Sequence, residues 1–107
     1  MTETWRCVAR LHELESEYPK RVEVGAHEIA LYLVNGEVYA TGDVCSHAYA
    51  RLSDGHVEGF EVVCPLHGGG FDVRTGEALS EPCTEPITVF DCRLEGDSVL
   101  VKVDGDA

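Results

Sequence analysis

The stretch Glu28-Ile29-Ala30-Leu31-Tyr32-Leu33-Val34-Asn35-Gly36 decides the fold class. In an extended chain, alternate side chains point to opposite faces, so one face carries Ile29, Leu31 and Leu33. The other face carries Ala30, Tyr32 and Val34. Because both faces are apolar, the pattern predicts a central strand that is buried on both sides. Asn35-Gly36 then predicts a tight hairpin, with Val38–Thr41 as the returning strand.

Short apolar runs continue on both sides of this hairpin, separated by turn residues. The predicted strands are Trp5–Ala9, Arg21–Val24, Phe60–Cys64, Phe71–Val73, Thr88–Leu94 and Val99–Val103. The charged stretch Leu11–Tyr18 ends at Pro19 and predicts a loop with at most one helical turn. Gly96-Asp97 predicts a turn before the last strand. Several short strands at short spacing are typical of a small all-β domain.

The length and composition fit one domain with a specialised insertion. The chain has 107 residues, so residues 1–107 are predicted to form a single domain. Residues 42–86 are rich in glycine, cysteine, histidine and proline and poor in long strands. We therefore expect this segment to be a subdomain that the β-sheets carry, because functional residues commonly lie on loops above a rigid scaffold.

The charge and hydropathy exclude several classes of protein. Twenty acidic residues against eight basic ones give a net charge of −12, which argues against nucleic acid and anionic membranes as partners. The longest apolar run, Ile29–Val34, is far shorter than the ~20 residues of a membrane-spanning helix. The N-terminus lacks the pattern of a signal peptide, so a cytoplasmic location is expected. Five cysteines, an odd number, argue against a disulfide framework.

Two cysteine–histidine pairs provide the strongest chemical signal. Cys45-Ser46-His47 is followed, after 16 intervening residues, by Cys64-Pro65-Leu66-His67. Each pair lies in a predicted loop and offers one sulfur and one nitrogen ligand. A closed structural zinc site is one interpretation. The other is a Rieske [2Fe–2S] centre, in which two histidines replace two cysteines on one of the two irons. The mixed pairs favour this second interpretation, because each loop then supplies one ligand to each iron.

The motif Cys45-Ser46-His47 through Cys64-Pro65-Leu66-His67-Gly68 resembles that of the Rieske ferredoxins of bacterial aromatic ring-hydroxylating dioxygenase systems. The neighbouring stretches Leu52–Gly55 and Phe71–Ala78 are similar to the same family, which includes carbazole, biphenyl and naphthalene dioxygenase ferredoxins. The resemblance implies antiparallel sheets with a cluster-binding subdomain. It also implies one [2Fe–2S] cluster, with Cys45 and Cys64 on one iron and His47 and His67 on the other.

The same resemblance implies an electron carrier rather than an enzyme. Its expected partners are a flavin-containing ferredoxin reductase and a terminal oxygenase, and we expect a cytoplasmic monomer. Two alternatives are a zinc-stabilised structural or interaction domain and the small subunit of a nitrite reductase.

Differences from the bc-type Rieske proteins bear on the reduction potential. Those proteins have bridging cysteines where this chain has Ala50 and Leu66. They also have hydroxyl groups, serine and tyrosine, where this chain has Gly69 and Phe71. Hydrogen bonds from such hydroxyls stabilise the reduced cluster, so their loss predicts a potential near the low end of the Rieske range.

The remaining candidate residues have structural interpretations. The other three cysteines are expected to be small buried apolar side chains: Cys7, Cys83 and Cys92. Three histidines without ligand partners are expected at the surface or in hydrogen bonds: His12, His27 and His56. Cluster shielding or an ordinary structural role is expected for Leu52, Leu66 and Pro82. Gly68-Gly69-Gly70 is expected to direct backbone N–H groups toward the cluster sulfides.

Overall fold

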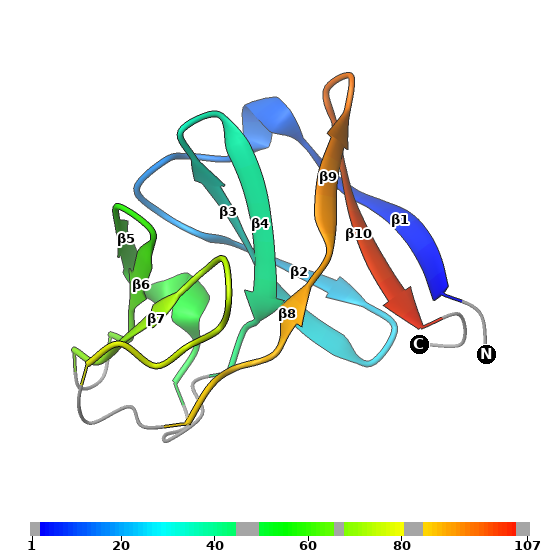
Figure 1. Cartoon of the computed structure of the whole chain (residues 1–107). Coiled ribbons are helices and arrows are strands. Elements are labelled where there is room, and N and C mark those ends of the chain that lie inside the picture. Colours follow the sequence, from blue (N-terminus) through cyan, green and yellow to red (C-terminus); the bar gives the residue numbers. More distant parts are fainter. Residues whose placement is uncertain (1–2, 45–49, 66–67, 81–84, 105–107) are drawn as a thin grey trace.

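The computed structural model describes residues 3–44, 50–65, 68–80 and 85–104, and these form three small antiparallel sheets (Figure 1). The outer sheet has the order β1-β10-β9, with β1 at Glu3–Arg10, β10 at Ser98–Asp104 and β9 at Cys92–Glu95. The central sheet has the order β2-β3-β4-β8. Its strands are Lys20–Val24, His27–Val34, Glu37–Gly42 and Val89–Phe90.

The small sheet lies at the opposite side of the central sheet from the outer sheet (Figure 1). It has the order β5-β6-β7, with strands His56–Glu58, Glu61–Val63 and Gly70–Asp72. The described residues contain two short 3-10 helices, η1 at Leu11–Glu13 and η2 at Leu52–Asp54. The predicted all-β class is therefore confirmed. No helix in the described ranges is long and apolar enough to cross a membrane.

The hairpin predicted at Asn35-Gly36 joins β3 to β4. Both residues adopt positive φ angles, 53° at Asn35 and 81° at Gly36, as a type I′ turn requires. Such a turn matches the twist of the two strands. Their antiparallel pairing runs from Ile29 opposite Gly42 to Val34 opposite Glu37. The predicted central position of β3 is also confirmed, because β2 and β4 flank it.

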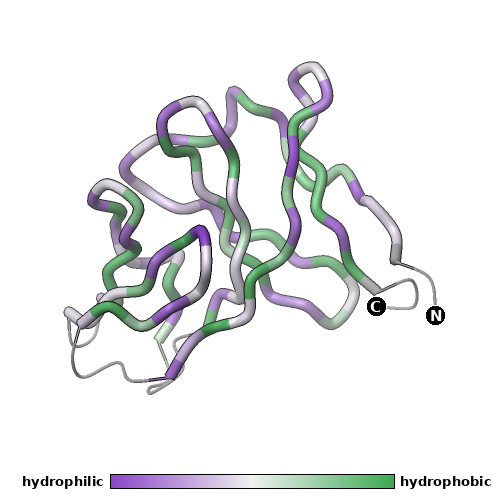
Figure 2. The backbone as a smooth tube through the Cα atoms, viewed as in Figure 1, coloured by the Kyte–Doolittle hydropathy of each residue, from purple (hydrophilic) through white to green (hydrophobic). Residues whose placement is uncertain are grey.

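Two separate hydrophobic cores pack against the two faces of β3. Ala30, Tyr32 and Val34 belong to a core shared with the small sheet. Ile29, Leu31 and Leu33 belong to, or pack against, a second core shared with the outer sheet. Figure 2 shows the hydrophobic positions concentrated along the strands, with hydrophilic positions at several turns. The alternating apolar pattern of β3 thus places this strand between the scaffold and the small sheet.

Two details differ from the sequence-based expectation. The predicted strand Thr88–Leu94 is wrong as a single element, because the chain divides at Asp91. Before it, β8 pairs with β4 of the central sheet; after it, β9 pairs with β10 of the outer sheet. The Asp91 carbonyl accepts a hydrogen bond of 2.9 Å from Lys102 N at this crossing between sheets. Strand β5 was not predicted from the sequence.

Candidate metal centre

The first cysteine–histidine motif follows directly from the end of β4. Val44 and Arg51 form an isolated antiparallel bridge, and Leu52 N donates a 2.7 Å hydrogen bond to the Asp43 carbonyl. These contacts bring the two ends of the first loop together and connect it to η2. Cys45 and His47 themselves lie outside the described residues. The described structure therefore fixes where the first loop begins and ends.

The second motif lies in the hairpin between β6 and β7. Val63 pairs with Gly70, Cys64 N donates to Gly69 O at 2.7 Å, and Gly68 N donates to Cys64 O at 3.0 Å. Gly68 has a φ of 78°, which a side chain disfavours, so the glycine permits this tight turn. Cys64 is only 1% exposed. His67 lies outside the described residues.

The two loops begin and end beside one another. Leu52, just after the first loop, belongs to the same buried core as Cys64, and Ala50 packs against that core. Gly55 is so close to β6 that a Cβ atom there would lie 2.0 Å from the Val63 carbonyl oxygen. Both loops emerge at the same end of the molecule (Figure 1). A buried cysteine beside the ends of a second cysteine–histidine loop fits a metal centre that draws ligands from both loops.

No competing metal site appears in the part of the chain that the structure describes. Outside the gaps at 45–49, 66–67 and 81–84, no three His, Cys, Asp or Glu side chains come together as a metal site would require. His27 packs edge-on against Phe90, with 5.4 Å between ring centroids. His56 Nε2 lies 2.7 Å from Glu58 Oε2, and His12 is exposed. The expected surface or hydrogen-bonded position is confirmed for His12 and His56, whereas His27 is partly buried against Phe90.

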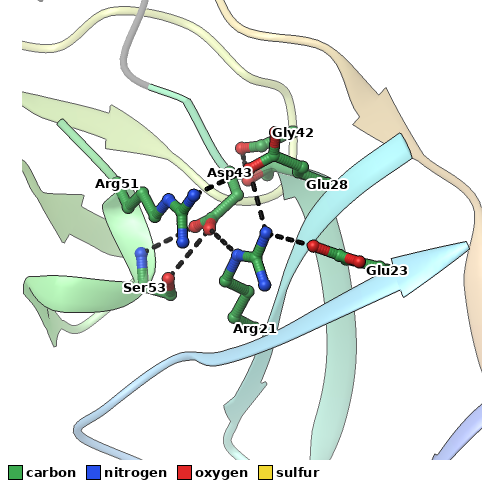
Figure 3. Close-up of polar contacts among 8 residues, drawn as sticks. Arg21, Glu23, Glu28, Gly42, Asp43, Arg51 and Ser53 are labelled. Atoms are coloured by element: carbon green, nitrogen blue, oxygen red, sulfur yellow. Dashed lines mark hydrogen bonds and ion pairs between the residues drawn. The ribbon is translucent and has the colours of Figure 1, made fainter. Parts of the chain in front are cut away.

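A polar network that the sequence analysis did not identify surrounds the ends of the first loop. Its members, called here the Asp43 network, are Arg21, Glu23, Glu28, Asp43, Arg51 and Ser53 (Figure 3). The Asp43 side chain is fully buried. Burial raises the pKa of this carboxyl group, while hydrogen bonds from Ser53 and the nearby Arg21 and Arg51 oppose that rise. Asp43 is thus a buried carboxyl group with two hydrogen bonds from Ser53 and an ion pair with Arg21 at the start of the first loop.

A second ion pair stabilises the turn after β7. Arg74 Nε and Nη2 donate to the two carboxylate oxygens of Asp72 at 3.0 and 2.9 Å. These hydrogen bonds hold the pKa of Asp72 below its ordinary value. The Arg74 guanidinium also lies 4.0 Å from the centroid of the Phe60 ring. The pair therefore connects β7 to the β5–β6 hairpin from the outside.

The expectations for the other cysteines are partly wrong. Cys7 is exposed, so its interpretation as a buried residue is incorrect: it lies on the solvent side of β1. Cys92 is partly buried against the second core, and burial raises its pKa to about 12. Leu52 is fully buried and belongs to the core. Three other expectations fall outside the described residues: those for Cys83, Pro82 and Leu66.

The expected role of the three glycines also needs a correction. Gly68 N donates to the Cys64 carbonyl, and Gly70 N donates to Ser80 Oγ at 3.1 Å. Two of the three N–H groups thus bond within the protein instead of pointing to cluster sulfides. A Cβ at Gly70 would lie 1.8 Å from the Glu61 carboxylate, which is the flexible end of a side chain and would have to move. The segment is a close-packed turn as well as a loop that carries ligands.

Comparisons with known proteins agree with this site. The sequence pattern of the Rieske [2Fe-2S] domain family matches residues 4–91. A naphthalene 1,2-dioxygenase system ferredoxin component from Pseudomonas aeruginosa is 46% identical over 96% of this chain and 99% of its own length.

Solved structures agree in fold and length. A chain from a complex of reduced oxygenase and oxidized ferredoxin in carbazole 1,9a-dioxygenase is 40% identical, with a TM-score of 0.84 over 91% of both chains. The small subunit of a putative NADPH nitrite reductase, 22% identical with a TM-score of 0.80 over 92% and 97% of the two chains, shares the fold. From the family match over residues 4–91 and the 46% identity over nearly the whole chain, the chain belongs to the Rieske [2Fe-2S] domain family.

Proposed function

We propose that the chain is the electron-transfer ferredoxin of an aromatic-ring dioxygenase system, with one Rieske [2Fe–2S] cluster as its cofactor. The observation that supports this most is the convergence of two loops, each containing one cysteine and one histidine, at one end of a β scaffold. Relatives of nearly the same length are named as ferredoxin components of such systems. The cluster supplies one-electron redox chemistry, and the chain is a carrier rather than a catalyst.

The proposed ligands are Cys45 and Cys64 on one iron and His47 and His67 on the other. Both pairs come from loops whose ends the described residues hold together, which supports the proposal that all four side chains bind one cluster. Residues 42–86 then form the cluster-binding subdomain within a single domain. The burial of Cys64 supports its proposed role as a ligand, because the protein shell around a metal site limits the access of solvent to it.

The oxygenase is proposed to dock at the cluster end. Val44 directly precedes the first loop and Leu79 N donates to the Gly70 carbonyl, and the two side chains are 48% and 47% exposed. Val44 and Phe90 also line an open groove of about 610 Å³ beside the first loop. A small, partly apolar contact suits a transient redox complex. We further propose a flavin-containing reductase as electron donor, a monomeric state and a cytoplasmic location.

The −12 charge predicts that encounter with the reductase depends on salt. Raising the ionic strength from roughly 10 mM to 0.15 M shortens the Debye length from about 30 to about 8 Å. The rate of ferredoxin reduction by its reductase, followed by stopped-flow absorbance, should fall over this range because electrostatic steering is screened. A rate independent of salt would restrict the acidic surface to a role in solubility.

Ligation is tested by replacing both proposed histidine ligands, His47→Cys with His67→Cys. The wild type should be red-brown, contain two iron atoms per chain and show the lowered average g value that nitrogen ligation gives in EPR. The double variant should lose this signal, whereas His12→Asn, at an exposed histidine, should keep it. A colourless wild type that binds zinc would support the structural zinc domain instead. An unchanged EPR signal in the double variant would show that the ligands are wrong.

A further inference from the structure

Every polar group of Asp43 is used to hold the first ligand loop in place. Its N–H donates to the Glu28 carbonyl at 3.0 Å, and its carbonyl accepts from Leu52 N at 2.7 Å. Its carboxylate accepts from Ser53 N at 2.8 Å and from Ser53 Oγ at 2.9 Å. One bond connects Asp43 to β3 and three connect it to η2, beyond the loop. Asp43 therefore fixes the start of the loop relative to its end and to the central sheet.

Arg21 connects this residue to the scaffold. Its Nε lies 3.4 Å from Asp43 Oδ2, and its Nη2 lies 3.1 Å from Glu28 Oε1 and 2.5 Å from Glu23 Oε2 (Figure 3). Arg21 lies on β2, where it pairs with Ala30 of β3. Asp43 thus links the start of the first ligand loop to β2 through its carboxylate and to β3 through its backbone N–H.

The charges of the Asp43 network differ in how far solvent screens them. The Asp43 side chain is fully buried, whereas those of Glu23 and Glu28 are 59% and 40% exposed. Solvent weakens the field of exposed charges far more than that of a buried one. Arg21, with a side chain 28% exposed, is the cation in contact with the buried carboxylate. Among the described ion pairs of this network, the contact between Asp43 and Arg21 is the one that includes a fully buried side chain.

We infer that Asp43 and Arg21 are positioning residues for the electron site that shift its reduction potential in opposite directions. The inference rests on the proposed ligation by Cys45, which follows Asp43 by two residues in the sequence. A buried negative charge near the cluster disfavours the uptake of an electron, and a guanidinium beside that charge favours it.

The test measures reduction potential by protein-film voltammetry at pH 8 on four variants of the Asp43–Arg21 pair and on one control variant. Asp43→Asn removes the buried charge and should raise the potential. Arg21→Met removes its counter-charge and should lower the potential, while Arg21→Lys should restore most of the wild-type value. Each single change should alter the equilibrium constant for reduction at least threefold, or about 28 mV at 59 mV per tenfold change for one electron. The double variant removes one negative and one positive charge together, so its potential should lie between those of the two single variants.

A matched control separates charge from position. Asp97→Asn makes the same charge change in the β9–β10 turn, far from the cluster end (Figure 1), where Asp97 pairs with Arg10 at 3.1 Å. It should leave the potential unchanged. If Asp43→Asn cannot retain its cluster, the required role of Asp43 in loop position is supported, and Arg21→Met with its lysine rescue decides the electrostatic part.

Three results would overturn the inference. In the first, both single variants shift the potential in the same direction, as general loosening of the loop would do. In the second, their shifts are no larger than that of Asp97→Asn. In the third, Arg21→Lys behaves like Arg21→Met. The proposed function is judged separately, on the EPR signal and iron content of the wild type.

Discussion

Gly55, at the end of η2, packs closely against Val63 of β6, and replacing it with alanine should disturb both segments. An added Cβ would lie 2.0 Å from the Val63 carbonyl oxygen, 3.2 Å from the Val63 carbonyl carbon and 3.3 Å from the Leu52 carbonyl oxygen. Real Cβ contacts essentially never fall below 3.0 Å. The chain must therefore open by about 1 Å. All three neighbours are backbone atoms, so no side-chain rotation can relieve the clash.

The cost follows from this geometry. Overpacking in a well-packed interior costs about 1–3 kcal/mol, and a clash between backbone segments belongs at the upper end, about 2–3 kcal/mol. For a domain of this size, that loss of unfolding free energy corresponds to a fall in Tm of roughly 10–20 °C. Because Val63 directly precedes Cys64, the same displacement should also speed loss of the cluster. Thermal denaturation followed by circular dichroism and decay of the visible absorbance measure the two effects.

Gly36→Ala is the matched control for this experiment. Gly36 has a φ of 81° but nothing within 4 Å of an added Cβ, so alanine there suffers only backbone strain of roughly 1 kcal/mol. It lies in the β3–β4 turn, at the end away from the ligand loops (Figure 1). Its cluster should therefore persist as in wild type. If Gly55→Ala keeps its cluster as long as Gly36→Ala and loses no more Tm, the argument from steric contact is refuted.

Three further predictions concern single side chains. Phe71→Tyr should raise the reduction potential by tens of millivolts, because a hydrogen bond to a charged acceptor contributes up to ~3 kcal/mol, and voltammetry showing no rise with an intact cluster would contradict this. The lowered pKa of Asp72 means that its pair with Arg74 stabilises the fold above about pH 4 and less as pH falls through that lowered pKa. The urea midpoint difference between wild type and Asp72→Asn should therefore shrink in acid, and a constant difference would exclude the ion pair as its cause. Iodoacetamide at pH 8 should label exposed Cys7 far faster than Cys92, whose pKa is raised to about 12; equal labelling by mass spectrometry would contradict this.

The parts of the fold that the sequence predicted are those set by local pattern. Alternation in β3 predicted two buried faces, and Asn35-Gly36 predicted the turn, because both signals lie within a few residues. The division at Asp91 could not be predicted in this way. Apolar alternation continues from Phe90 to Leu94, while the change of partner from β4 to β10 depends on distant strands. The three-residue strand β5 is too short to carry a clear period.

The site shows the same contrast between local and distant information. The two cysteine–histidine pairs have local spacings that indicate a cluster of the Rieske type. The Asp43 network has no such spacing, because Arg21 and Ser53 approach Asp43 from separate segments of the chain. The exposure of Cys7 was missed because β1 is an edge strand of the outer sheet, with an exposed face that its mixed sequence does not mark.

The alternation of β3 between two cores offers a route for protein engineering. Ala30, Tyr32 and Val34 face the core that contains Cys64, whereas Ile29 and Leu31 face the core of the outer sheet. Substitutions at successive positions of one strand therefore report on two different properties of the molecule. Substitutions on the face of β3 that packs against the outer sheet should change the stability of the fold, because they alter a core that does not contain Cys64. In a ferredoxin of this architecture, the packing of the outer sheet can be changed from one face of β3 and the surroundings of Cys64 from the other.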